Sequence, residues 1–120
     1  MLLLNACSGG QKEESVSTSR EEPLDQAIAK GAELFRRNGC IVCHGETGKG
    51  DGSIAHTLKR VPRNLHDSTS YQRGPSIAQI EETIRQGIGT GVGSMVGYPH
   101  IKPENRRRIA QFIHSLQKVK

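Results

Sequence analysis

The sequence predicts an all-α fold of three to four short helices in one domain. Apolar residues recur at helical spacing in three segments, at about residues 23–38, 76–87 and 103–116. Gly-rich loops connect these segments, and no strand-rich stretch flanks them. The chain has 120 residues, which suits a single domain, but only 3% of them are aromatic and there is no Trp. Because so small a domain buries little apolar surface, its core needs a further apolar component.

The first predicted helix, at about residues 23–38, leads directly to a cysteine pair. Pro23 is tolerated in a first helical turn, and Asn38-Gly39 is typical of a helix end. The residues between them that we expect to face the core recur at helical spacing: Leu24, Ile28, Gly31 or Ala32, and Phe35.

The run Cys40-Ile41-Val42-Cys43-His44 is the attachment signature of c-type haem. Cysteines three positions apart lie on one side of a helical turn, so each thiol can add to one vinyl group of the same porphyrin. His44 follows directly and can offer an imidazole nitrogen to the iron. The motif predicts one covalent haem c, attached through Cys40 and Cys43, with His44 as an axial iron ligand. A large apolar ring would also complete the small core, so we expect the haem-free chain to be poorly folded.

Two other kinds of site could use the same residues. A thioredoxin-like redox pair would need a βαβ context, which the flanking sequence lacks. A structural zinc site would need four ligands, usually supplied as two separated pairs. Cys40, Cys43 and His44 supply three, so a distant histidine would have to supply the fourth.

The middle of the chain combines loops with a second predicted helix. We expect a short helical turn within residues 53–59 and a loop at 61–75. The helix begins at Ser76, where Gln79 completes a capping box, and Gly87 ends it. Its apolar residues lie on one face: Ile77, Ile80 and Ile84.

Met95 lies in the Gly-rich loop at residues 88–102, just before the last helix. Such a loop is a poor place for a Met that fills a core gap and a good place for a chain that wraps a flat ring. We therefore expect Met95 to be the second axial ligand, opposite His44, where a thioether raises the reduction potential of haem. The rivals are the remaining histidines, of which His100 is the most serious: His56, His66, His100 and His114.

The last predicted helix opens with Pro103-Glu104 and carries its apolar residues on one stripe: Ile109, Phe112, Ile113 and Leu116. Arg106-Arg107-Arg108 is the densest basic cluster, which we interpret as the solvated side of this helix. The formal net charge is +5, and a basic face can steer docking onto an acidic partner or anionic lipid. No nucleic-acid-binding motif accompanies the cluster and stacking aromatics are scarce, so nucleic acid is not an expected partner.

The beginning of the chain resembles a lipoprotein signal. Leu4-Asn5-Ala6-Cys7 resembles a bacterial lipobox, in which a small residue precedes a cysteine that is lipidated after the leader is cut. Polar residues with the composition of a flexible tether follow. Cys7 would then anchor the chain to a lipid bilayer, and the alternative is an idle thiol in a tail. The expected divisions are a truncated signal segment at residues 1–6, a tether at 7–22 and a folded domain at 23–120.

From about residue 24 to residue 118 the chain resembles the class I cytochromes c. Gly31 and Phe35 look like the Gly-x-x-x-aromatic pair of that family's first helix, where the small residue lets the last helix cross closely. Phe112 is placed like the aromatic residue that completes this contact. The resemblance therefore implies a small cytochrome c fold, with the helices wrapped around the haem.

The same resemblance extends to the loops around the haem. Pro62 followed by Asn64-Leu65 resembles the family's Pro-Asn-Leu segment, with Arg63 inserted. It implies that the Pro62 carbonyl accepts a hydrogen bond from the ligand His, with Asn64 beside it. Met95-Val96-Gly97-Tyr98 resembles the family's Met-Pro-x-aromatic run. Tyr71 and Arg73 lie where members of the family often contact the haem propionates, and the alternative is that both are exposed loop residues.

The resemblance implies a one-electron carrier rather than an enzyme. An iron with both axial positions filled has no vacant site for a substrate. The partners would be redox protein donors and acceptors, with a membrane-bound oxidase or reductase expected, in the periplasm or at the outer face of the cytoplasmic membrane. A fixed electron-transfer subunit of a larger complex fits the same residues. The alternative from another class is a haem-based gas sensor or peroxidase-like protein with a labile Met95, although no distal acid–base pair is visible.

Overall fold

The computed structural model describes residues 22–90 and 93–117, and in this part of the chain the fold is all-α, as predicted. The helices are α2 (Leu24–Arg37), α3 (Cys40–His44), α4 (Ile77–Gln86) and α5 (Pro103–Leu116), with 3-10 turns at Ala55–Thr57 and Ser68–Ser70. An isolated antiparallel bridge joins Ile88 to Met95. None of these helices is long and apolar enough to cross a membrane. The lipobox-like segment, Cys7 and most of the expected tether lie outside the described residues.

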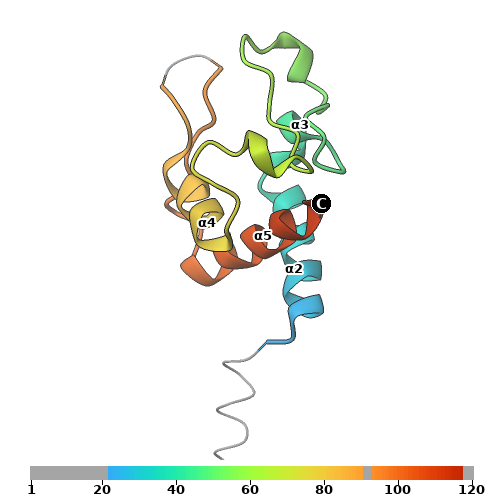
Figure 1. Ribbon diagram of the computed structural model, residues 1–120, viewed down its shortest axis with the longest axis vertical. Coiled ribbons are helices and arrows are strands. Elements are labelled where there is room, and N and C mark those ends of the chain that lie inside the picture. The colour runs from blue at the N-terminus through green and yellow to red at the C-terminus, as the bar shows by residue number, and fades with distance from the viewer. Residues whose placement is uncertain (1–21, 91–92, 118–120) are drawn as a thin grey trace, which may run out of the picture.

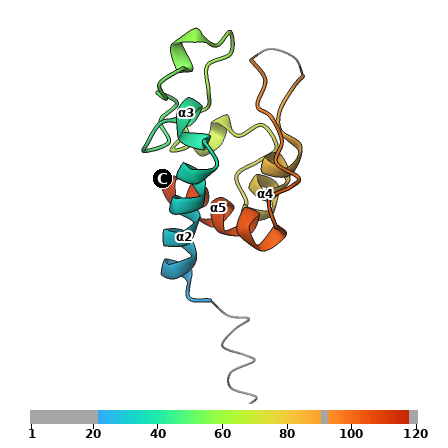
Figure 2. The same ribbon diagram turned by 180° about the vertical axis from the view of Figure 1, so that it is seen from behind.

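Helix α5 crosses α2, and this contact organises the molecule (Figures 1 and 2). Gly31 lies at the crossing, where a Cβ atom would overlap the carbonyl oxygen of Arg108 and come within 2.9 Å of the Cβ of Phe112. The rings of Phe35 and Phe112 pack beside it with their centroids 5.2 Å apart. The close crossing expected from Gly31, Phe35 and Phe112 is therefore present.

The core lies between α2, α4 and α5 and is closed by loop residues. Its buried members come from the helices and from the loops before α4 and α5: Phe35, Leu65, Ile80, Ile84, Ile101, Ile109, Ala110 and Ile113. On α2 the buried side is formed by Ala27, Gly31 and Phe35, which are spaced four residues apart. The expectation that Leu24 faces the core is wrong, because its side chain is 59% exposed. This end of α2 extends past α5 (Figure 1).

Glu22 ties the start of the described chain to α5. Its carboxylate accepts hydrogen bonds from Lys30, at 2.6 Å, and from Arg108, at 2.9 Å. The Arg108 guanidinium, followed by Lys30, lowers the pKa of Glu22 below its usual range. Glu22, the last residue of the expected tether, thus contacts both α2 and α5.

Helix α4 begins and ends as its sequence predicts. Ser76 Oγ accepts a hydrogen bond from the backbone N–H of Gln79, and Gln79 Oε1 accepts one from the backbone N–H of Ser76, each at 3.1 Å. This reciprocal capping box satisfies two N–H groups that the first turn leaves free. Gly87 ends the helix with a φ of 78°, a conformation that glycine adopts without steric cost.

The Arg106-Arg107-Arg108 cluster is more than a solvated helix side. Arg106 donates to the carbonyls of Pro99 and Ile101 in the preceding loop. Arg107 is exposed and pairs with Glu81 of α4 at 3.1 Å. Together with the bond from Arg108 to Glu22, these contacts hold α5 to three other parts of the chain.

Candidate functional site

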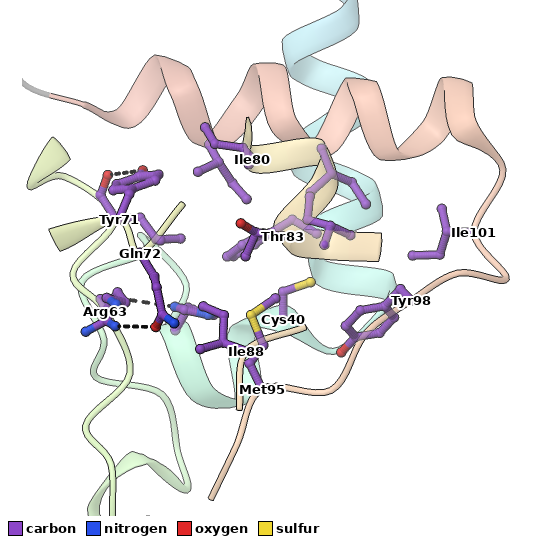
Figure 3. A pocket seen from close by; sticks show the side chains of 16 residues that line it. Cys40, Arg63, Tyr71, Gln72, Ile80, Thr83, Ile88, Met95, Tyr98 and Ile101 are labelled. Carbon is purple, nitrogen blue, oxygen red and sulfur yellow. Dashed lines mark hydrogen bonds between the residues drawn. The ribbon is translucent and has the colours of Figure 1, made fainter. Parts of the chain in front are cut away.

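A cavity opens beside the core, between the helices and the loops that carry Arg63, Tyr71 and Met95 (Figure 3). The empty space that it encloses is about 640 Å³, a volume that includes open solvent at its mouth. Its walls are largely apolar and come chiefly from α4, α5 and the flanking loops: Leu65, Ile80, Ile84, Ile88, Ile109 and Ile113.

Helix α3 carries the cysteine motif to the wall of this cavity. Gly39, with a φ of 80°, makes the turn out of α2, a conformation that side chains other than glycine rarely adopt. Cys40 and His44 then line the cavity, at opposite ends of a single helical turn. Cys40 and Cys43 form no disulfide with each other and are both half-buried. Burial raises the pKa of the Cys40 thiol to about 11.

His44 has the protonation state that an iron ligand needs. Its Nδ1 lies 3.3 Å from the carbonyl oxygen of Arg63. A carbonyl only accepts, so Nδ1 carries the proton and Nε2 keeps its lone pair. Burial lowers the pKa of His44, although the bond to Arg63 works in the opposite direction, and the imidazole is neutral at pH 7.

The expectation that the Pro62 carbonyl accepts the bond from His44 is wrong by one residue, because the acceptor is the carbonyl of Arg63. The Pro62 carbonyl faces Gly50 instead, where a Cβ atom would come within 2.6 Å of it. The inserted Arg63 is the physical reason. One extra residue between Pro62 and Asn64 places the following carbonyl opposite the imidazole.

Met95 lines the same cavity from the loop before α5. Its backbone exchanges two hydrogen bonds with the backbone of Ile88, at 2.9 and 3.0 Å. These bonds hold the loop around Met95 against the segment that follows α4. Glycines allow the close approach on both sides. A Cβ at Gly87 would overlap the carbonyl of Met95, and one at Gly97 would lie 2.6 Å from the carbonyl of Arg85. The thioether is thus presented from a fixed backbone position.

The other histidines lie away from the cavity. Among the described residues that line it, His44 is the sole histidine. His100 is exposed and packs its ring against Tyr98, with centroids 5.8 Å apart. His66 bonds to the carbonyl of Thr47 at 2.7 Å through Nε2. His56 and His114 are exposed. The arrangement favours Met95 over a second histidine.

Of the two candidate propionate contacts, Tyr71 lines the cavity and Arg73 does not. Tyr71 lines the cavity and donates its hydroxyl to the carbonyl of Leu65 at 2.6 Å. Arg73 does not line the cavity, since its guanidinium donates to the carbonyl of Gly87 at 3.0 Å and to Gln86 at 3.3 Å. Asn64 also lies outside the lining, where its side chain accepts from the backbone of His66 at 3.0 Å and shapes the turn.

Arg63 is the cavity residue that sequence reasoning missed. Its side chain lines the cavity and donates from Nη2 to Gln72 Oε1 at 3.1 Å (Figure 3). Its Nε–H is buried without a hydrogen-bond partner among the described residues. The insertion after Pro62 was visible in the sequence, but nothing there indicated where the side chain points.

These residues fit a covalently attached haem. The walls suit a flat apolar ring, Cys40 and the neutral His44 face the space, and Arg63 offers a buried unpaired donor to an acidic group. The alternatives lack support in the described part of the chain. No group of His, Cys, Asp and Glu side chains there could hold a metal ion, as a zinc site requires. A thioredoxin-like βαβ unit is likewise absent from the elements of residues 22–90 and 93–117.

Comparison with known proteins identifies the family and supports the fold. The model of the family described as cytochrome c matches residues 28–117. A similar curated protein is the cbb3-type cytochrome c oxidase subunit FixP of Azorhizobium caulinodans, which is 36% identical over 101 residues. That alignment covers 83% of this chain and 31% of the relative, so the chain spans about a third of the relative's length. A chain of the reducing HAO-like protein complex of Kuenenia stuttgartiensis has a similar fold, with a TM-score of 0.60 and 24% identity over 73% of this chain and 41% of its own.

Proposed function

This chain belongs to the cytochrome c family, and on that premise we propose that it is a class I, one-electron carrier whose haem c iron is ligated by His44 and Met95. Membership of the family implies covalently bound haem c. The observation that carries the proposal is that Met95, which is distant in the sequence from the cysteine motif, lines the same apolar cavity as Cys40 and His44 of that motif.

Each residue has a defined task in this function. The haem supplies an iron that gains and loses one electron. Cys40 and Cys43 would hold the ring by thioether bonds. His44 is kept neutral by burial and oriented by the Arg63 carbonyl. Met95, whose backbone is hydrogen-bonded to Ile88, would supply its thioether as the second ligand of the iron and favour the reduced iron.

The setting that we propose is a membrane-bound respiratory chain in the periplasm or at the outer face of the cytoplasmic membrane. Support comes from the relative of 36% identity, which is named as a subunit of a cbb3-type oxidase. Redox proteins, including a membrane-bound oxidase or reductase, would be the donors and acceptors. A lipid on Cys7 would keep the carrier near them, through a tether that ends before the contacts of Glu22.

Carbon monoxide separates a carrier from a gas sensor or peroxidase-like protein. We expect the ferrous protein to show no change in its visible spectrum with a stoichiometric amount of carbon monoxide, because both axial positions are filled. Tight stoichiometric binding of carbon monoxide by the unsubstituted protein would contradict the carrier proposal and favour the sensor.

A further inference from the structure

Arg63 makes two different contacts. Its charged side chain lines the cavity, and its backbone carbonyl accepts a hydrogen bond from His44. The guanidinium donates one hydrogen bond to Gln72, which holds the planar group in place. The Nε–H is buried and has no partner in the described structure. A buried donor without an acceptor costs free energy, and a charged one costs more, so such a group calls for a partner.

The cavity itself offers no anion to this guanidinium. None of the described residues that line it is Asp or Glu. The acceptor that suits a guanidinium best is a carboxylate, through short charge-assisted bonds. The group that the family places in this cavity carries two carboxylates, its propionates.

Arg73 is less suited to this contact than Arg63. Its Nη1 and Nη2 donate to the carbonyl of Gly87 and to Gln86, where they support the end of α4. The hydroxyl of Tyr71 likewise already donates a hydrogen bond, to the carbonyl of Leu65. Arg73, at the position where the family often places an arginine contact to a propionate, thus does not line the cavity in this chain.

We propose that Arg63 is a positioning residue that binds a carboxylate of the bound haem through its guanidinium while its carbonyl fixes the imidazole of His44. The inference rests on the proposed function and adds a residue to it. Because the two contacts belong to one residue, the acidic edge of the ring and the iron ligand are held in register. The positive charge of Arg63 beside the ring also disfavours the ferric iron, so it raises the reduction potential.

The test compares Arg63→Gln and Arg63→Lys with Arg73→Gln, a matched control that removes the same charge from the neighbouring loop. Each holoprotein is first checked for the methionine–iron absorption band, so that only variants with intact ligation are compared. The readouts are the propionate bending mode in the resonance Raman spectrum and the midpoint potential at one pH. Arg63→Lys keeps the charge without the planar fork and provides a variant that loads haem if Arg63→Gln does not.

We expect Arg63→Gln to shift the propionate mode and lower the midpoint potential. Arg63→Lys should shift the mode while keeping most of the potential, and Arg73→Gln should leave the mode unchanged. A shift of the mode in Arg73→Gln alone, or in no variant, would overturn the assignment to Arg63. Failure of the unsubstituted protein to attach haem would instead overturn the proposed function, so the two failures are distinguishable.

Discussion

Replacing Met95 with alanine is expected to leave the haem attached but to remove one axial ligand from its iron. The methionine–iron band of the oxidised protein should disappear, and the ferrous protein should now bind carbon monoxide. The midpoint potential should fall by a substantial part of the roughly 0.8 V range that axial ligands set in haem proteins. The fall follows because a neutral thioether stabilises ferrous iron. Visible spectra and a potentiometric titration measure these changes.

Val96→Ala is the matched control for this variant. Val96 is the next residue in the same loop and its side chain is 63% exposed, so its truncation should change neither the band nor the potential. A His100→Ala variant tests the rival ligand. If Met95→Ala kept the wild-type spectrum while His100→Ala lost it, His100 and not Met95 would be the ligand.

Replacing Gly31 with valine is expected to disrupt the crossing of α2 and α5. Even the first added carbon would overlap the backbone carbonyl of Arg108, which cannot move unless α5 moves with it. Overpacking of this kind typically costs 1–3 kcal/mol, and a backbone obstacle places Gly31→Val at about 3 kcal/mol or more. For a domain of this size that corresponds to a fall in Tm of roughly 12 °C or more, measured by thermal unfolding of the holoprotein.

Ala29→Val serves as the control, because Ala29 is an exposed position of the same helix. Its cost should stay below about 1 kcal/mol, the loss of helix propensity. Equal Tm values for Gly31→Val and Ala29→Val would show that α2 and α5 do not cross at Gly31.

The helices were predictable because their signals are local. Apolar spacing located α2, α4 and α5, and the Ser76–Gln79 capping box marked the first turn of α4. Leu24 was misassigned because periodicity shows which residues share a side of a helix, but not where along the helix the core ends. The ion pair of Glu22 with Arg108 could not be predicted for a related reason, since it joins residues 86 positions apart.

In the candidate site, too, the residues with local sequence signals could be predicted and those set by distant contacts could not. Cys40, Cys43 and His44 form a contiguous motif, and Met95 stood out through the composition of its loop, so both could be proposed from the sequence. The carbonyl that holds His44 could not, because the insertion of Arg63 shifts the backbone by one residue relative to the family pattern. Nor could sequence decide which of two loop arginines turns inward. That choice depends on acceptors such as the Gly87 carbonyl, which engages Arg73.

The most direct test of the central claim is the visible spectrum of the purified protein, oxidised and reduced, together with a pyridine haemochrome assay. The protein should be produced in a host with cytochrome c maturation. We predict one covalent c-type haem per chain, with the weak far-red methionine–iron band in the oxidised form. Protein from such a host without covalent haem would contradict the account, and covalent haem with a high-spin spectrum would contradict ligation by Met95.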